Sequence, residues 1–263
     1  MTYKTKKKVG LALGGGAARG IAHIGVLKAF VEHKIPIDFI AATSAGAVGA
    51  SFYAAGLSID KIVEIAENLT WKNFSRFKLS RKGLVSSKPI EELIEKHAGK
   101  ITFKDLSLPV NILVTDILTG EGVQLNDPDM KVALAVRASA SFPGIYEPIE
   151  INNRYFCDGG AAFNLPCKVV REMGADIVIG VNVIPQVQLK TLPINVATLV
   201  DRGLDILLNS SLKFLENEAE IILSPITERM TSFSVKKGKK LIELGYNCVI
   251  DNLNKIKMLL DEK

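Results

Sequence analysis

Cysteine is scarce in this 263-residue chain, and the few cysteines form no recognisable framework. Cys157, Cys167 and Cys248 are odd in number, and no two of them form a C-x-x-C pair. Disulfide-stabilised secreted domains and zinc sites both depend on paired cysteines at characteristic spacings. We therefore expect reduced thiols in a cytoplasmic protein and no metal site, since Asp127 and Asp129 are too few carboxylates for calcium.

Long apolar runs and a strong charge of one sign are also missing. No stretch approaches the roughly 20 consecutive apolar residues of a membrane-spanning helix. The lysine-rich start resembles a signal peptide, but glycines soon follow it, which favours a buried strand entering a turn. The net charge of +5 is too small to indicate nucleic acid, although it favours an anionic membrane surface. We expect peripheral contact with the inner membrane at most.

Short apolar segments alternate with segments of helical periodicity along the chain. The expected strands are 9–13, 37–41, 110–115, 122–125 and 177–183, and the expected helices are 21–34, 45–56, 130–139 and 166–173. This alternation predicts the α/β class, as a three-layer α/β/α arrangement around a mostly parallel central sheet. We expect one domain over residues 1–263, in which 195–263 form a mostly helical C-terminal part.

Residues 71–87 depart from this alternation because aromatic and cationic side chains are mixed there. The residues concerned are Trp71, Lys72, Phe74, Arg76, Phe77, Lys78, Arg81 and Lys82. Such a mixture suits a flap at a lipid–water interface. The competing interpretation is a surface excursion whose aromatic rings pack on the core while the lysines remain in solvent.

The segment Ala42-Thr43-Ser44-Ala45-Gly46 stands between an expected strand and an expected helix. A sharp turn of this kind lifts a serine oxygen clear of a sheet and requires small neighbours. The N–H groups at the start of the helix would favour negative charge developing there. Ser44 is therefore a candidate nucleophile, and the alternative is that it only caps the helix.

A glycine-rich loop, Gly14-Gly15-Gly16-Ala17-Ala18-Arg19-Gly20, follows the first expected strand. Consecutive backbone N–H groups in such a loop can bind either a dinucleotide pyrophosphate or the oxyanion of an acyl-transfer intermediate. The dinucleotide interpretation is poor, because arginine stands at position 19 of the G-x-G-x-x-G pattern. An acidic residue is also missing at the end of the second expected strand.

Asp158 is the best candidate partner for Ser44, because Asp158-Gly159-Gly160 stands at the end of an expected strand and can lie close to another side chain. The alternative is an ordinary turn, in which Asp-Gly is common. No histidine follows position 97, which excludes the Ser–Asp–His order of α/β-hydrolases. His23 remains a second candidate base. A carboxylate can also act as the base when it is held against the hydroxyl in a dry pocket.

Together and in this order, the three elements resemble the patatin-like phospholipase family, in particular its small single-domain bacterial members. The segment Arg137–Gly144, with sequence R-A-S-A-S-F-P-G, also resembles the stretch that precedes the aspartate in this family. Ala42 departs from the family's G-x-S-x-G pattern, in which glycine is the first residue.

The resemblance implies a serine acyl-ester hydrolase acting on lipids, of the phospholipase A, lysophospholipase or esterase type, without cofactor or metal. Ser44 would be the nucleophile and Asp158 the general base, while the N–H groups of Gly15, Gly16 and Ala17 would form the oxyanion hole. Supporting roles would fall to Gly14, Arg19, Gly20, Gly46 and Gly159. The alternatives are a non-catalytic lipid- or protein-binding member of the same fold and, more distantly, a nucleotide-binding protein. The oligomeric state is open, with a homodimer as one option.

Overall fold

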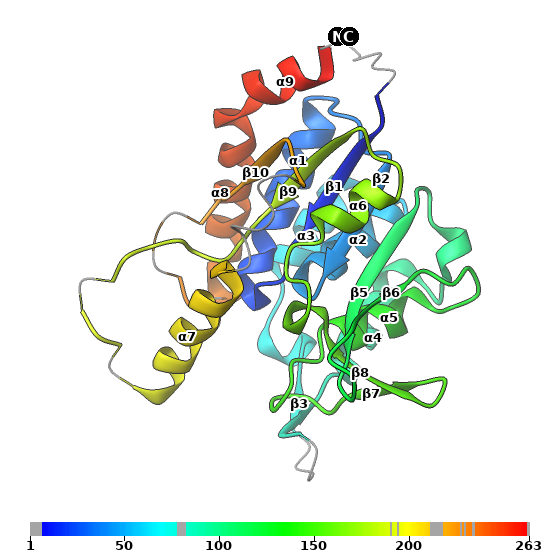
Figure 1. Ribbon diagram of the computed structural model, residues 1–263, viewed down its shortest axis with the longest axis vertical. Coiled ribbons are helices and arrows are strands. Elements are labelled where there is room, and N and C mark those ends of the chain that lie inside the picture. The colour runs from blue at the N-terminus through cyan, green and yellow to red at the C-terminus, as the bar shows by residue number, and fades with distance from the viewer. Residues whose placement is uncertain are drawn as a thin grey trace.

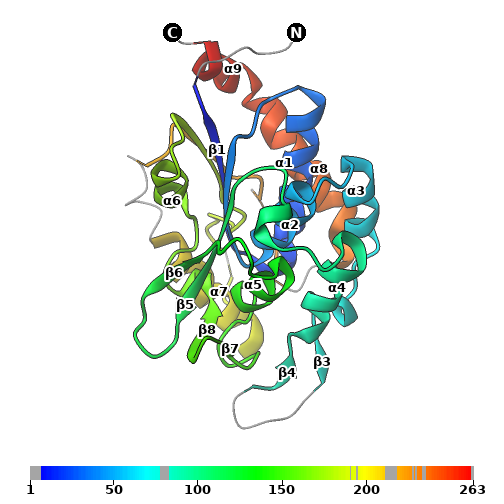
Figure 2. The same ribbon diagram turned by 90° about the vertical axis from the view of Figure 1, so that its right-hand side faces the viewer.

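The computed structural model describes residues 7–77, 83–189, 191–193, 195–210, 218–226, 228, 230–232 and 235–261. A central sheet lies between two layers of helices, so the predicted three-layer α/β class is confirmed (Figure 1 and Figure 2). The strands of this sheet are β1 (Val9–Leu13), β2 (Phe39–Thr43), β5 (Val110–Asp116), β6 (Gly122–Leu125), β7 (Ile149–Ile151), β8 (Arg154–Asp158), β9 (Ile177–Val181) and β10 (Ile221–Leu223). The α-helices are α1 (Ala22–Glu32), α2 (Ala45–Ala54), α3 (Ile59–Glu67), α4 (Lys88–Ala98), α5 (Val132–Ser139), α6 (Cys167–Glu172), α7 (Val196–Ser210), α8 (Gly238–Asp251) and α9 (Leu253–Asp261).

The sheet is mostly parallel, as the alternation of strands and helices predicts. Its strand order is β10-β9-β1-β2-β5-β8-β7, and β6 pairs with β5 outside this path. Neighbouring strands from β10 to β5 are parallel, whereas β6, β7 and β8 pair antiparallel. Parallel neighbours require a crossover connection, which the helices between these strands provide.

Strand β1 shows why the inner strands are continuously apolar. All its residues are buried, because helices cover both faces of the sheet. Leu11 and Leu13 belong to the larger core, which includes side chains of α1, α2 and α8, while Ala12 belongs to the smaller core that includes α6. β1 carries only small residues on its α6 side, Gly10 and Ala12, and a Cβ on Gly10 would lie 1.9 Å from Cγ1 of Val170.

One edge of β5 brings two strand ends together. Residues 110–113 of β5 pair with β2, and residues 114–116 pair with the antiparallel strand β8. β6 occupies the opposite edge of β5. Thr43, at the end of β2, is therefore opposite Leu113, and Asp158, at the end of β8, is opposite the adjacent Val114. The next residue after β2, Ser44, consequently lies beside the end of β8.

Several elements differ from the sequence-based expectations. β2 begins two residues later than predicted, because the Asp38 carboxylate accepts a hydrogen bond from the Val9 N–H at 2.8 Å and ends the preceding turn. The C-terminal part, predicted to be mostly helical, also contains the edge strand β10. Helices α3 and α4 were not predicted, although α3 has a capping serine, Ser58, whose side chain accepts a hydrogen bond from the Lys61 N–H.

The expected flap at 71–87 is only partly described, and Lys78, Arg81 and Lys82 lie outside the described residues. Its ends form the short hairpin of β3 (Arg76–Phe77) and β4 (Val85–Ser86). Phe74 packs against the larger core, whereas the Phe77 ring is 83% exposed. The segment therefore combines features of both interpretations, with one ring on the core and one in solvent.

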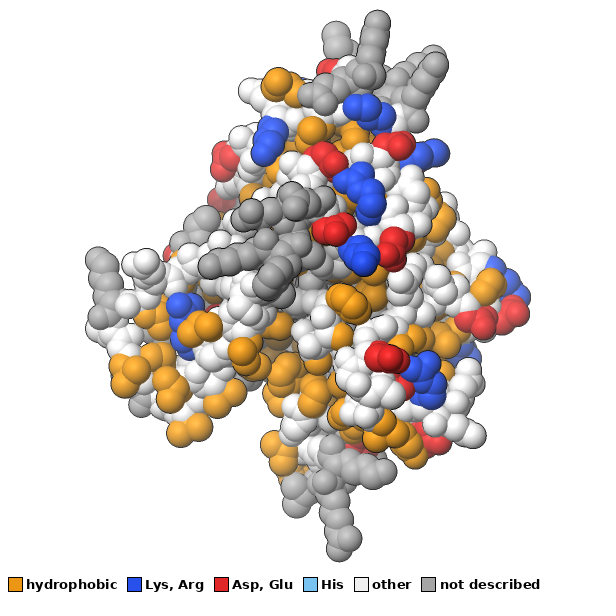
Figure 3. Space-filling model, in the orientation of Figure 1, with side chains coloured by type: hydrophobic (Ala, Val, Ile, Leu, Met, Phe, Trp, Pro, Cys, Tyr) orange, Lys and Arg blue, Asp and Glu red, His pale blue; other side chains and the backbone are white. Residues whose placement is uncertain are grey.

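Helix α7 lies at the outside of the molecule, and apolar side chains gather over it (Figure 1 and Figure 3). No helix among the described residues is long and apolar enough to cross a membrane.

Helices α1 and α8 pack at close range through a reciprocal pair of glycines. A Cβ on Gly245 would lie 1.9 Å from the carbonyl oxygen of Ala22, and a Cβ on Gly25 would lie 1.9 Å from that of Ile242. Only glycine permits this backbone separation, although glycine lowers the stability of an isolated helix.

We therefore expect Gly245→Ala to destabilise the protein by roughly 1–3 kcal/mol, because the methyl group would force α8 away from α1. Gly203→Ala in α7 is the matched control, since nothing lies within 4 Å of its Cβ position. This control should stabilise the protein by up to about 1 kcal/mol through helix propensity. Urea unfolding measures both changes, and equal stabilisation by the two substitutions would contradict the close packing.

Candidate active site

Ser44 sits in the strained turn that the sequence predicts between β2 and α2. Its φ and ψ are 52° and −119°, a left-handed φ that non-glycine residues rarely adopt. The Ser44 N–H donates to Oγ of Ser139 at 2.8 Å, and this hydroxyl donates to the carbonyl of Leu113 at 2.6 Å. Gly46 must be small, because a Cβ there would lie 2.4 Å from the Leu13 carbonyl oxygen. The Ser44 side chain caps no N–H of α2, so the capping interpretation is wrong.

The Ser44 hydroxyl instead donates to Oδ2 of Asp158 at 2.6 Å. The other carboxylate oxygen, Oδ1, accepts a hydrogen bond from the Gly160 N–H at 2.8 Å. The Asp158 backbone is fixed as well, since its N–H donates to the Ser141 carbonyl and its own carbonyl accepts from the Thr115 hydroxyl. Both side chains of the Ser44–Asp158 pair are therefore held from several directions.

Burial raises the pKa of the Asp158 carboxyl from its usual value of 3.8 to about 6. The hydrogen bonds from Ser44 and Gly160 act in the opposite direction, but they are weaker than the loss of hydration. Asp158 is 5% exposed. A carboxylate of this kind remains ionised at neutral pH and is a stronger base than one in water.

His23 serves the glycine loop and not the serine. Its Nε2 lies 2.7 Å from the carbonyl oxygen of Gly14, which can only accept, so Nε2 carries the proton. Burial lowers the pKa of His23 to about 4, so the ring is neutral at physiological pH. Nδ1 has no hydrogen-bond partner among the described residues. This geometry favours a structural role for His23.

The glycine loop passes directly beside Ser44. A Cβ on Gly15 would lie 3.2 Å from the Cβ of Ser44, so the loop backbone contacts the serine. The Gly15 N–H, however, donates to the backbone carbonyl of Asn164 at 3.2 Å. The Gly14 N–H donates to the backbone carbonyl of Val181 at 3.1 Å. Of the three donors suggested by the sequence, Gly15 is therefore already engaged.

The next two N–H groups of the loop, from Gly16 and Ala17, have no acceptor in the described part of the chain. Ala17 has a positive φ of 50°, and it begins the 3₁₀ turn η1 (Ala17–Ile21). At the far end of this turn, a Cβ on Gly20 would lie 2.3 Å from the Cβ of Ala45. The turn is thus packed against the start of α2, next to the nucleophile. Gly159, which follows Asp158, must also be glycine, because a Cβ there would lie 2.2 Å from the Leu113 carbonyl oxygen.

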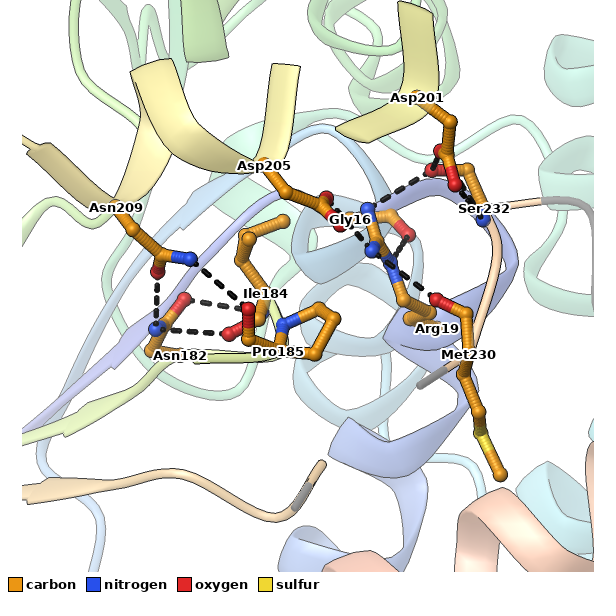
Figure 4. Close-up of polar contacts among 10 residues, drawn as sticks. All are labelled: Gly16, Arg19, Asn182, Ile184, Pro185, Asp201, Asp205, Asn209, Met230 and Ser232. Atoms are coloured by element: carbon orange, nitrogen blue, oxygen red, sulfur yellow. Dashed lines mark hydrogen bonds and ion pairs between the residues drawn. The ribbon is translucent and has the colours of Figure 1, made fainter. Parts of the chain in front are cut away.

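Arg19 braces the loop through buried contacts (Figure 4). Its Nε donates to the Gly16 carbonyl at 3.3 Å, and one terminal nitrogen pairs with the carboxylate of Asp205 in α7 at 2.7 Å. The other terminal nitrogen donates to the Ser232 hydroxyl at 2.8 Å, and this hydroxyl donates to Asp201, also in α7. Arg19 is 2% exposed, so its supporting role is to brace the loop from inside the protein.

Asn164 is a residue of this site that the sequence reasoning missed. It is 6% exposed, its carbonyl holds Gly15, and its amide lies against Gly15 and Gly160. The Nδ2 group has no acceptor among the described residues. The only sequence cue is an asparagine six positions after Asp158, which identifies no role by itself.

An apolar pocket begins beside the nucleophile. It holds about 440 Å³ of free space, part of it open to solvent, and lies between α1, α2 and α3. Its lining includes Ala17 of the loop, Ala45 and Val48 of α2, and Phe74. Within the described ranges, no group of three His, Cys, Asp or Glu side chains is placed to hold a metal ion. The site therefore combines a serine, a buried carboxylate, free N–H groups and an apolar cavity.

The chain is similar to several known proteins. A family model for patatin-like phospholipase matches residues 11–171. An uncharacterized NTE family protein of Mycobacterium bovis is 34% identical over 178 residues, which cover 66% of this chain and 49% of the relative. The lysophospholipase NTE1 of Eremothecium gossypii is 32% identical over 181 residues, which cover 66% of this chain and 12% of the relative. The chain thus spans less than half the length of either relative.

Among solved structures, VipD from Legionella pneumophila has a TM-score of 0.56 at 15% sequence identity. The match covers 95% of this chain and 67% of VipD, and at this identity it shows the fold alone. The family model, by contrast, covers more than half of the sequence, including the loop, the serine turn and the aspartate. The chain belongs to the patatin-like phospholipase family.

Proposed function

We propose that this protein is a serine hydrolase that cleaves fatty-acyl esters of lipids through a Ser44–Asp158 dyad. The observation that carries the proposal is the 2.6 Å hydrogen bond from the Ser44 hydroxyl to the buried Asp158 carboxylate. Family membership supports a lipid substrate, as does the name of the fungal relative, a lysophospholipase. The apolar pocket beside Ser44 supports an acyl chain as the recognised part of the substrate.

In the first half of the reaction, the Ser44 oxygen attacks the ester carbonyl while its proton passes to Oδ2 of Asp158. The negative charge that develops on the carbonyl oxygen would be met by the N–H groups of Gly16 and Ala17, together with the start of α2. Collapse of the tetrahedral intermediate breaks the ester bond. The alcohol leaves with the proton from Asp158, and the acyl group remains on Ser44.

In the second half, Asp158 takes a proton from water, and the resulting hydroxide attacks the acyl-enzyme. The fatty acid leaves, and Ser44 regains its proton from Asp158. The buried amide of Asn164 supports this step, because its Oδ1 lies beside Gly15 and Gly160 while its Nδ2 has no acceptor among the described residues and could donate a hydrogen bond to a water or an intermediate. No step requires a group outside this chain, the ester and water.

We expect Ser44→Ala and Asp158→Asn each to lower kcat for a nitrophenyl ester by at least roughly a thousandfold, because each removes a member of the dyad. Ser51→Ala is the matched control, since this buried serine of α2 donates only to the Val48 carbonyl of its own helix. Near-wild-type activity of Asp158→Asn would exclude the dyad. Inactivity of the wild type toward nitrophenyl and phospholipid esters alike would indicate the non-catalytic alternative.

The raised pKa of Asp158 predicts opposite effects on activity and stability. The base must be ionised, so kcat/KM should fall about tenfold per pH unit below a pH of about 6. Asp158 binds a proton more tightly in the folded state than in the unfolded state. Loss of this proton therefore lowers the free energy of unfolding as the pH rises from about 4 to 6. The folded-state and unfolded-state pKa values of Asp158 differ by about two, which lowers the free energy of unfolding by ~3 kcal/mol at pH values above this range.

The side chain in Asp158→Asn carries no charge at any pH, so this variant should not lose stability as the pH rises. We therefore expect the inactive variant to be more stable than wild type at pH 8, by up to ~3 kcal/mol, with the difference vanishing near pH 4. Thermal and urea unfolding over this pH range measure it. A difference that does not change with pH would mean that Asp158 is not desolvated.

The size of the apolar pocket is expected to determine which acyl-chain lengths the enzyme accepts. Val48→Phe, one helical turn beyond Ser44, should fill the pocket and lower kcat/KM for long-chain esters at least roughly tenfold relative to acetyl esters. Val63→Phe is the matched control, because Val63 is also half-buried but does not line the pocket. Equal losses on short and long esters would place the acyl chain elsewhere.

A further inference from the structure

Helix α7 has its polar side against the protein and its apolar side outward. The only fully buried residues among its 15 are Asp201 and Asp205. Five of its seven large apolar side chains are instead 49–78% exposed, and they follow the three- and four-residue spacing of one helix face: Val196, Leu199, Val200, Ile206 and Leu207. The other two, Leu204 and Leu208, are half-buried beside the aspartates. None of the exposed residues of α7 is charged. A surface helix in water normally shows the opposite arrangement.

The inverted orientation is fixed by hydrogen bonds and a buried ion pair (Figure 4). Asp205 pairs with Arg19, and Asp201 accepts from the Ser232 hydroxyl. At the end of the helix, Asn209 bonds to Asn182 and to the Pro185 carbonyl. Rotating α7 to bury its apolar face would break the Arg19–Asp205 pair and leave a buried arginine without its partner, which costs several kcal/mol. The apolar face therefore stays outward.

Helix α7 lies close to the candidate active site. α7 is joined by Arg19 to the loop that supplies the N–H groups of Gly16 and Ala17. On the side of the nucleophile, the carbonyl of the half-exposed Phe163 accepts a hydrogen bond from Thr43, the residue before Ser44. In Figure 3 orange side chains gather over α7 and along the lower end of the molecule, whereas most blue and red side chains lie elsewhere. Apolar surface thus extends from α7 along this end of the molecule.

A lipid bilayer fits this surface better than a second copy of the chain. A stable dimer buries about 800 Å² on each partner, which is more than one row of side chains on a single helix supplies. A helix of 15 residues, roughly 22 Å long, with one uncharged apolar face has the form of helices that lie in the membrane interface. The net charge of +5 favours an anionic surface.

We propose that α7 docks on a lipid bilayer with its apolar face immersed in the interface, and that the Arg19–Asp205 pair holds the helix to the glycine loop during docking. The inference rests on the proposed function, in that an acyl-ester hydrolase must meet substrate held in a membrane. It places the membrane contact on α7, whereas the sequence suggested residues 71–87. Docking there would bring the membrane surface near the glycine loop, to which Arg19 joins α7.

The test is flotation with vesicles of phosphatidylcholine, with and without phosphatidylglycerol. All proteins carry Ser44→Ala, so that binding is measured without turnover. We expect the parent protein to float with the anionic vesicles, and the added pair Leu199→Gln and Leu207→Gln to weaken partitioning at least roughly tenfold. Met258→Gln in α9, at the other end of the molecule, is the matched control, because Met258 and Leu207 are both 67% exposed (Figure 1). Thermal unfolding checks that each variant is folded.

Unchanged flotation of the double variant would overturn the proposal, as would equal weakening by Met258→Gln or a parent protein that does not float. Sedimentation velocity tests whether a second copy of the chain covers α7 instead. If the double substitution converts a dimer to a monomer without changing flotation, a second copy covers α7 and the membrane proposal is wrong. Flotation that depends on α7, together with an active-serine protein that hydrolyses no ester, would reject the proposed function and leave the membrane contact standing.

Discussion

The pairing of two strands with one edge of β5 is the constraint on which the candidate site depends. β2 ends at Thr43 and β8 ends at Asp158, on consecutive residues of β5, so the serine and the carboxylate meet without any long side chain. Because side chains alternate across a strand, a shift of β8 by one residue would turn Asp158 to the other face of the sheet. The Ser139 hydroxyl holds the Ser44 backbone and the Ser141 carbonyl holds the Asp158 backbone, so the Arg137–Gly144 segment supports both residues, and the first contact explains the serine at position 139.

The two buried charged residues near the site, Arg19 and Asp158, differ in whether they have a partner of opposite charge. Arg19 is compensated by Asp205 and by hydroxyl and carbonyl acceptors, so it provides rigidity. Asp158 receives only hydrogen bonds, from Ser44 and Gly160, and has no cationic partner among the described ion pairs. A nearby arginine would lower the pKa of Asp158 and weaken it as a base. In the proposed mechanism, keeping the carboxylate dry and unpaired serves its reactivity at a cost in stability.

The orientation of α7 follows from the same ion pair. Its sequence has the periodicity of a helix with one apolar face, which in most proteins would be packed on the core. Asp205 reverses that expectation here, because burying an unpaired Arg19 is more unfavourable than exposing a row of leucine and valine side chains. The brace of the glycine loop and the outward apolar face are therefore two consequences of a single contact.

Local sequence was sufficient for much of the fold. The apolar runs around Leu11 and Ile179, flanked by helical periodicity, predicted a mostly parallel sheet, because strands covered on both faces must be apolar throughout. The three-residue strand β10 and helix α3 were missed. A segment as short as β10 becomes a strand only through pairing with β9, and nothing in Ile221–Leu223 specifies that neighbour.

The sequence by itself also determined which residues could react: it contained Ser44 in a turn of small residues, Asp158 before two glycines, and no histidine after position 97. Only the tertiary structure decided how they are used. The Gly15 N–H donates a hydrogen bond to the carbonyl of the distant Asn164, and the His23 ring donates one to the carbonyl of Gly14. The direction of α7 was likewise set by Arg19, 186 residues before Asp205. Spacing along a chain reports the geometry of one element, whereas desolvation and pairing depend on what the folded chain brings beside it.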